Sequence, residues 1–208
     1  RLLSAGSPDY SGQMSLHPHR RVGSWARLGE SVRAGEPSRR RVSHDSDDSE
    51  RESFLLGMFN LAMLLAPQVV KQIDLAKRKR LLDLGGGPGT YAIHFCLHNP
   101  ELQATIFDLP TTRSTAEKTI EQFTLQGRIN FVAGDFQHDL LAGGYEVAWL
   151  SHVLHGEGEA GCANMLQKTV GALQPGGLVL VQEFILDDTR DSPLFPALFS
   201  LNMLLGTP

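Results

Sequence analysis

The feature that most constrains the fold is a glycine-rich turn between a short apolar segment and a helical pattern. The apolar residues at 80–84 lead directly into Asp83-Leu84-Gly85-Gly86-Gly87-Pro88-Gly89-Thr90. Glycine lets the backbone approach a ligand closely, and a helix that starts there offers free N–H groups. The stretch therefore predicts a strand, a turn and a helix that together hold a small molecule, although a plain turn of an α/β chain can have the same composition.

Apolar periodicity on both sides of this turn predicts a regular alternation of strands and helices. The predicted strands are 80–84, 103–108, 129–132, 145–150 and 178–186, and the predicted helices are 54–73, 91–97, 112–125 and 159–173. This βαβ spacing is typical of a parallel sheet with helices on both faces. Right-handed crossovers then give a Rossmann-like, doubly wound α/β fold. The first helix is expected to bury one face, formed by Leu55, Met58, Phe59, Ala62, Leu65 and Ala66.

The composition changes near residue 55. The part before it is rich in Arg, Ser, Gly and Pro and has no Lys, and its run Arg39-Arg40-Arg41 is followed by an acidic run over 45–52. Adjacent blocks of opposite charge are typical of solvated loops, and only 24–32 has an amphipathic helical pattern. We therefore predict a linker or partial N-terminal segment at 1–55 and one α/β domain at 56–208. Because the chain does not begin with Met, we expect it to be part of a longer protein.

The overall charge and the two cysteines exclude several classes of function. With 19 basic and 23 acidic residues the net charge is -4, which argues against a nucleic-acid partner. Cys96 and Cys162 do not form a zinc-binding spacing, so no metal site is predicted. The apolar run at 54–67 is interrupted by Gly57 and Asn60 and is shorter than a membrane span. Without a signal-peptide core at its start, the chain is expected to be cytoplasmic and free of membrane.

The glycine spacing and two acids point to one class of ligand. The turn has the spacing G-x-G-x-G, whereas the dinucleotide fingerprint needs a glycine at the sixth position, where this chain has Thr90. A carboxylate at Asp83 suits a ligand with an ammonium group, and Asp108, at the end of the second strand, can accept both hydroxyls of a ribose. An adenosyl group with an amino-acid tail fits these features, so S-adenosylmethionine is the predicted cofactor. A nicotinamide-dependent dehydrogenase of the same fold is the less favoured alternative.

After the third strand, Gly134-Asp135-Phe136 indicates a third contact with the predicted cofactor. Asp135 could accept the adenine amino group while Phe136 packs on the face of the ring. A turn followed by a helix cap explains the same three residues equally well. Both interpretations are left open at this stage.

Taken together, these residues resemble the small-molecule O-methyltransferase family of class I methyltransferases, which includes acetylserotonin, caffeic acid and bacterial types. The similarity runs from Trp25 to Pro208. It rests on the motifs Asp83–Gly89, Phe107–Pro110, Gly134–Phe136, Val153–His155, Pro175–Gly177 and Ser200–Leu204. The last motif closely resembles the acetylserotonin branch. The resemblance implies transfer of a methyl group from S-adenosylmethionine to a hydroxyl of a small aromatic acceptor.

The resemblance also implies roles for individual residues. The residues expected to bind the cofactor are Asp83, Gly85, Gly87, Asp108, Gly134, Asp135, Phe136 and Ser151. His155 matches the catalytic base, and Glu183, 28 residues later, matches a glutamate that flanks it. The positions that line the acceptor pocket are Met63, Asn202 and Met203. The full-length protein is expected to be a homodimer, and transfer is expected to need no divalent ion.

The chain departs from the family pattern beside the histidine and at its ends. Family members usually read His-Asp-Trp, whereas this chain reads His155-Gly156-Glu157. The family's helical dimerisation domain and its last two strands have no counterpart here. A neutral histidine can take the proton of a hydroxyl as it attacks the methyl group. Gly156 invites an alternative, in which the fold binds S-adenosylmethionine but does not methylate.

Overall fold

The computed structural model, which describes residues 22–37 and 48–206, contains a five-stranded parallel sheet with the order β3-β2-β1-β4-β5. The strands are β1 (Arg80–Leu84), β2 (Gln103–Asp108), β3 (Ile129–Ala133), β4 (Tyr145–Ser151) and β5 (Leu173–Gln182). The strand order reverses between β1 and β4, and in open α/β sheets ligands bind at the carboxyl ends of the strands at such a point. The predicted doubly wound fold is confirmed.

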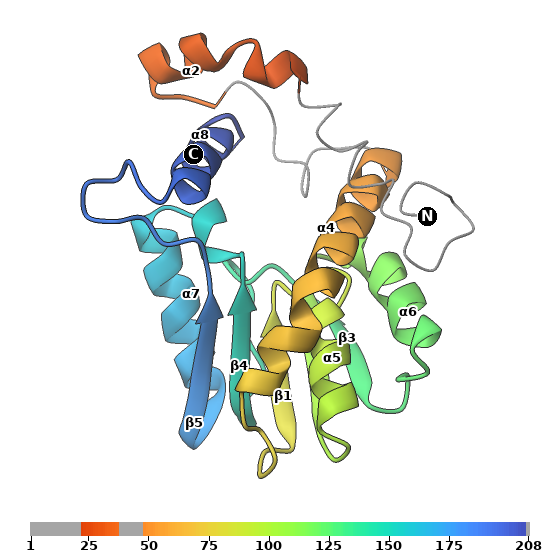
Figure 1. Cartoon of the computed structure of the whole chain (residues 1–208). Coiled ribbons are helices and arrows are strands. Elements are labelled where there is room, and N and C mark those ends of the chain that lie inside the picture. The colour runs from red at the N-terminus through yellow and green to blue at the C-terminus, as the bar shows by residue number, and fades with distance from the viewer. Residues whose placement is uncertain (1–21, 38–47, 207–208) are drawn as a thin grey trace.

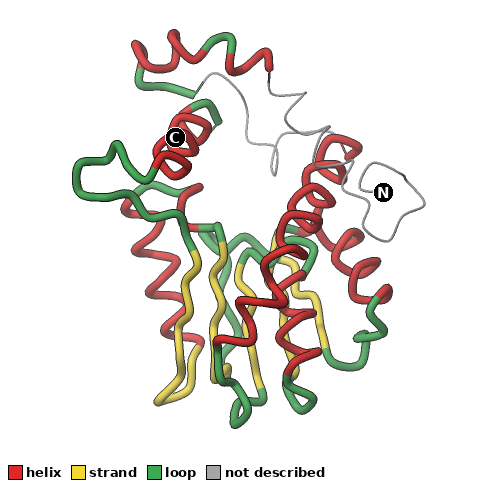
Figure 2. Tube along the Cα trace, viewed as in Figure 1, coloured by secondary structure: helices red, strands yellow, loops and turns green. Residues whose placement is uncertain are grey.

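Helices cover both faces of this sheet, as Figures 1 and 2 show. The α-helices are α2 (Leu28–Ala34), α4 (Asp48–Val69), α5 (Thr90–His98), α6 (Arg113–Gln122), α7 (Glu159–Ala172) and α8 (Leu194–Leu204). Short 3-10 helices are η1 (Val70–Gln72), η2 (Pro110–Thr112) and η3 (Leu154–Gly156). Helices α4, α5 and α6 lie on one face and α7 on the other, while α8 and α2 lie above the carboxyl ends of β4 and β5.

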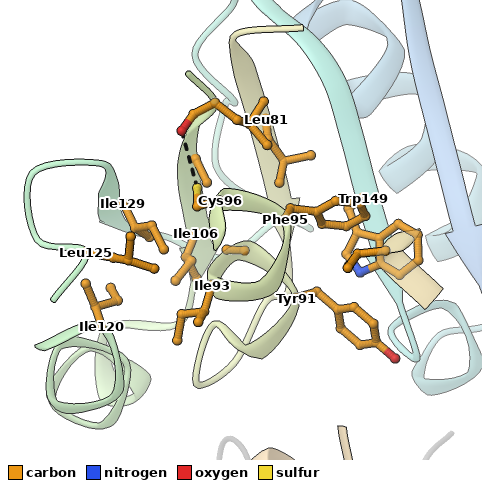
Figure 3. Packing of buried hydrophobic residues seen from close by; sticks show 14 of the residues in the cluster. Leu81, Tyr91, Ile93, Phe95, Cys96, Ile106, Ile120, Leu125, Ile129 and Trp149 are labelled. Carbon is orange, nitrogen blue, oxygen red and sulfur yellow. Dashed lines mark hydrogen bonds between the residues drawn. The ribbon is translucent and has the colours of Figure 1, made fainter. Parts of the chain in front are cut away.

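The two faces of the sheet bury separate hydrophobic clusters. Side chains alternate between the faces of a strand, so Leu81 joins the cluster under α4, α5 and α6, while Leu82 joins the one under α7. In the first cluster, the indole of Trp149 lies 4.9 Å from the Tyr91 ring and 5.1 Å from the Phe95 ring between ring centroids (Figure 3). This packing fixes the start of α5, and with it the glycine turn, against β1 and β4.

Helix α4 is longer than predicted. It begins at Asp48 and, with η1, continues to Gln72, and by length and composition alone these 25 residues could cross a membrane. Ala66 and Val70, however, are buried in the cluster shared with α5, as in a core helix. The expectation that Leu65 belongs to the buried face is wrong, because its side chain is 46% exposed. Of the other predicted residues, Leu55, Phe59 and Ala66 are buried.

Two further boundaries differ from the sequence prediction. Strand β5 starts at Leu173 and ends at Gln182, because Leu173 pairs with Tyr145 and Gln182 with Ser151. The single helix predicted over 24–32 is interrupted by a turn at 26–27, after which α2 begins. Helix α4 crosses residue 55, and the domain boundary proposed there stays a prediction. The run Arg39-Arg40-Arg41 lies outside the described residues, as does part of the acidic run after it.

Candidate active site

The glycine turn adopts a backbone that only glycine accepts easily. Gly85, Gly87 and Gly89 have φ angles of 65°, 55° and 80°. A Cβ on Gly85 would lie 2.7 Å from Cγ2 of Val153, and one on Gly89 would lie 2.4 Å from Cδ1 of Ile106. Both the left-handed conformation and the close neighbours therefore require glycine at these two positions. The turn lies at the carboxyl end of β1, beside the reversal of strand order.

The buried side chain of Asp83 packs against the glycine turn. Its side chain is 2% exposed, its Oδ2 accepts the N–H of Ala92 at 3.2 Å, and a Cβ on Gly86 would lie 2.6 Å from its Cγ. Burial raises the pKa of Asp83 to about 7; the Ala92 N–H opposes this shift and the nearby Asp108 adds to it. The carboxyl group is thus covered by backbone, and its predicted contact with a ligand's ammonium group stays a prediction.

Asp108 links the end of β2 to the turn. Its Oδ2 accepts the N–H of Gly87 at 2.7 Å, and its Oδ1 accepts the N–H of Leu109 at 2.7 Å and the hydroxyl of Thr112 at 3.2 Å. A carboxylate offers about four acceptor positions, so these groups and the hydroxyls of a ribose would share them. The structure places Asp108 beside Gly87 as a cofactor site requires, and its role as ribose acceptor stays a prediction.

The segment after β3 lies next to Asp108. The N–H of Gly134 donates to the backbone oxygen of Asp108 at 2.9 Å. Asp135 accepts the N–H of Gln137 on its Oδ1 at 2.8 Å, which is the local turn geometry that the sequence left open as an alternative. Phe136 packs with the second core cluster and lies near the glycine turn. The three residues are brought to the site, and contact of Asp135 with adenine stays a prediction.

Ser151, at the end of β4, belongs to a small polar group that the sequence only partly indicates. Its hydroxyl donates to Oε1 of Gln182 at 3.3 Å. Burial raises the pKa of Tyr91, while hydrogen bonds with Gln182 and Ser151 oppose the shift, so the phenol lies beside both. Neither Tyr91 nor Gln182 was predicted as a site residue. The signals that could have found them are their positions directly after the glycine turn and directly before Glu183.

His155 and Glu183 meet at the carboxyl edge of β4 and β5. Nδ1 of His155 lies 2.8 Å from Oε2 of Glu183, and Oε1 of Glu183 accepts the backbone N–H groups of Leu154 at 2.8 Å and of His155 at 3.3 Å. Burial alone would raise the pKa of Glu183, but the imidazoles of His152 and His155 outweigh it and hold this pKa below its ordinary value. Glu183 is therefore a carboxylate that orients His155.

His152 is a third member of this group and was not predicted as a site residue. Its backbone is left-handed, with a φ of 53°, and its Nδ1 lies 3.6 Å from Oε2 of Glu183, too far for a strong hydrogen bond. Its ring centroid lies 4.5 Å from that of Phe184. The sequence signal that could have found it is the pair of histidines three residues apart just after β4.

The residues predicted to line the acceptor pocket come from two separate helices. Met63 on α4 places its Sδ 3.2 Å from Nε2 of His94, whereas Asn202 and Met203 lie on α8. Figure 1 shows α4 and α8 on opposite sides of the upper edge of the sheet. Helix α8 reaches the candidate base through Phe199, whose ring lies edge-on to His155 at 5.0 Å. A role of these side chains in acceptor binding stays a prediction.

A separate hollow lies at the opposite, amino edge of the strands. It is lined among others by Arg80, Gln103, Arg128 and Asn130. None of the predicted site residues contributes to it, and doubly wound folds place their ligands at the carboxyl edge. We therefore assign the candidate active site to the glycine turn and the His155–Glu183 pair.

Comparison with known proteins shows the family of the chain. Residues 25–208 match the family model described as O-methyltransferase domain. The chain is 35% identical to 3-hydroxy-5-methyl-1-naphthoate 3-O-methyltransferase of Streptomyces sahachiroi, over 99% of this chain and 61% of the relative. It is 33% identical to acetylserotonin O-methyltransferase of Bos taurus, over 99% of this chain and 62% of the relative. The chain thus spans about three fifths of the length of these relatives.

Solved structures give the same result. An O-methyltransferase family protein from Burkholderia thailandensis superposes with a TM-score of 0.88 at 31% identity, covering 99% of this chain and 63% of that one. Human N-acetylserotonin methyltransferase in complex with SAM superposes with a TM-score of 0.83 at 28% identity, covering 99% of this chain and 64% of that one.

Proposed function

Because the chain belongs to the O-methyltransferase family, we propose that it transfers the methyl group of S-adenosylmethionine to a hydroxyl of a small aromatic acceptor. The names of two relatives, which act on a hydroxynaphthoate and on acetylserotonin, support the aromatic class of acceptor. The observation that carries the proposal is the contact between His155 and Glu183 at the carboxyl edge of the sheet. The family match also favours methyl transfer over the dehydrogenase alternative.

The residues at this edge fit the cofactor. Gly85 and Gly87 keep the turn free of side chains, and Asp108 lies beside Gly87 with a carboxylate that a ribose could use. When bound, S-adenosylmethionine supplies a methyl group on a positively charged sulfur. Since the donor is already activated, the protein mainly aligns the two reactants and removes a proton.

His155 is the proposed base. A phenol has a pKa of about 10 and attacks poorly while protonated. If Nδ1 of His155 donates to Glu183, Nε2 of the same ring is free to accept the acceptor's proton, and Glu183 stabilises the imidazolium that forms. General-base help of this kind contributes roughly 10²- to 10⁴-fold to a rate.

Replacement of His155 by Ala tests this role. The measurement, on the full-length protein, is transfer of a labelled methyl group from S-adenosylmethionine to a panel of phenols, with S-adenosylhomocysteine affinity measured in parallel. We expect transfer to fall roughly 10²- to 10⁴-fold with affinity unchanged. His98→Ala, at an exposed histidine at the end of α5, is the control. Unchanged turnover in His155→Ala would refute the assignment of His155 as the base.

Gly156 favours one second candidate, a module that binds S-adenosylmethionine without transferring its methyl group. The family's acid beside the base is missing here. Binding of S-adenosylhomocysteine with no product from any phenol would favour this module. A homodimer of the full-length protein, a cytoplasmic location and the lack of a nucleic-acid or membrane partner stay predictions.

A further inference from the structure

Three side chains that could bind a metal converge at the carboxyl edge of β4 and β5. One ring nitrogen of His152, one ring nitrogen of His155 and a carboxylate oxygen of Glu183 all lie within 4.8 Å of one another. Oε2 of Glu183 is 2.8 Å from the nitrogen of His155 and 3.6 Å from that of His152. We call these three residues the imidazole–carboxylate triad. The sequence predicted no metal site, because 28 residues separate Glu183 from His155 and only the pairing of β4 with β5 brings them together.

The backbone holds this triad in place. Oε1 of Glu183 accepts two backbone N–H groups at the start of η3, which leaves Oε2 for the imidazoles. Nδ1 of His152 is buried and has no hydrogen-bond partner among the described residues. A buried polar atom without a partner is costly, and a bound ion would satisfy it. That atom lies 3.6 Å from Oε2 of Glu183.

We propose that the imidazole–carboxylate triad binds a zinc ion and that this ion inhibits methyl transfer. Zinc binds imidazole nitrogen at about 2.0–2.1 Å and carboxylate oxygen at about 2.0–2.2 Å, so tetrahedral donor atoms lie about 3.3 Å apart. The two distances to Oε2, 2.8 and 3.6 Å, lie on either side of that value. The three donor atoms lie within 4.8 Å of one another, so the two imidazoles would move closer together as the ion binds. Two nitrogens and one oxygen suit zinc better than magnesium, which prefers six oxygens, and water takes the fourth position.

The inhibition follows from the position of one proton and rests on the proposed function. In the active form, the proton of His155 is on Nδ1 and the lone pair of Nε2 accepts the acceptor's proton. Zinc takes the lone pair at Nδ1, so the proton of the neutral ring moves to Nε2. No proton is gained or lost by the ring, but Nε2 has become a donor and can no longer act as base.

Zinc binding is measured without reference to activity, by competition between the untagged chain and a chromophoric zinc chelator. We expect His152→Asn, which tolerates a left-handed backbone, to weaken binding roughly ten- to a hundredfold. His152→Phe, which keeps a ring against Phe184, is the second variant. The control is His98→Ala, because His94 and His98 are four residues apart on α5 and form a histidine pair outside the triad. Unchanged affinity in both His152 variants, or loss of binding in His98→Ala, overturns the proposal.

Methyl transfer gives a second readout. We expect zinc to inhibit the wild-type chain, a chelator to restore its activity, and His152→Asn to resist zinc. Zinc that binds through the triad without slowing transfer overturns the inhibitory part of the proposal. A full-length protein that binds zinc but transfers no methyl group under any condition refutes the proposed function, while its zinc affinity still tests the triad.

Discussion

Glu183 holds His155 at both its backbone and its ring. Oε1 accepts the backbone N–H of His155 at 3.3 Å, and Oε2 lies 2.8 Å from Nδ1 of the same residue. The arrangement arises because Ser151 pairs with Gln182, so the two strands end together and the residues that follow them meet. The histidine thus has a fixed ring orientation before any acceptor binds.

Glu183→Gln is predicted to slow methyl transfer without weakening the binding of the cofactor. The amide keeps the size of the side chain but loses its negative charge, and a hydrogen bond to a charged group contributes roughly 1.5–3 kcal/mol, or about ten- to a hundredfold in rate. The measurement is kcat at saturating S-adenosylmethionine together with S-adenosylhomocysteine affinity. Glu159→Gln, at an exposed position in the first turn of α7, is the control. Equal losses of kcat in the two variants would contradict a specific role of Glu183 in methyl transfer.

Gly156→Asp is predicted to be tolerated and to raise turnover. No heavy atom lies within 4 Å of a Cβ at this position, so we expect the free energy of unfolding to change by less than about 0.5 kcal/mol. The new carboxylate would stand beside the base, as in the family pattern, and would favour the imidazolium that forms during transfer. Urea unfolding and kcat measure the two effects. A stable variant with lower turnover would contradict the prediction.

Local signals in the sequence were sufficient for most strands of the sheet and for the glycine turn. The strand at 103–108 and the turn from Gly85 to Gly89 are found where predicted, because apolar alternation and glycine spacing act within a few residues. The contact between His155 and Glu183 could be anticipated only from the family resemblance, which supplied the spacing between them.

Features that depend on tertiary contacts were not predictable in this way. The start of β5 at Leu173 is set by pairing with Tyr145, although Pro175, Gly176 and Gly177 lie within the strand and are poor strand formers. His152 joins the site only because its backbone turns left-handed at the end of β4. Its neighbours in sequence contain no signal for that conformation.

Gly89→Ala is predicted to destabilise the fold. The residue has a φ of 80°, and an added Cβ would lie 2.4 Å from Cδ1 of the buried Ile106. Strain and overpacking together should cost roughly 1–3 kcal/mol of the free energy of unfolding. Gly143→Ala is the matched control, since no atom lies within 4 Å of its Cβ. Urea denaturation that shows equal effects for the two variants would contradict the prediction.

Asp108→Ala is predicted to weaken the binding of S-adenosylhomocysteine. The change removes the carboxylate that accepts the N–H of Gly87 and that the cofactor's ribose is expected to use. The loss of hydrogen bonds to a charged group should reduce affinity roughly ten- to a hundredfold. Isothermal titration calorimetry measures it, with Asp74→Ala as a control at an exposed acid that accepts the N–H of Ala76 away from the site. Unchanged affinity in Asp108→Ala would refute the assignment of the ribose to Asp108.

Asp83→Asn is predicted to make the fold more stable than the wild type at alkaline pH. Burial raises the pKa of Asp83 from 3.8 to about 7, so between these values the folded chain keeps a proton that the unfolded chain has lost. The stability of the wild type therefore falls as pH rises from about 4 to about 7 and then levels off, because the folded state binds more protons over that range.

The asparagine has no proton to lose and keeps an oxygen for the N–H of Ala92. Near pH 4 the two proteins should differ little, and above pH 7 the variant should gain up to about 4 kcal/mol, since one pKa unit corresponds to about 1.4 kcal/mol. Urea unfolding of both proteins at pH 5 and pH 8 measures the difference. A wild type that gains stability relative to Asp83→Asn as pH rises would show that Asp83 is ionised in the fold, and its buried carboxyl group would then need a cationic partner.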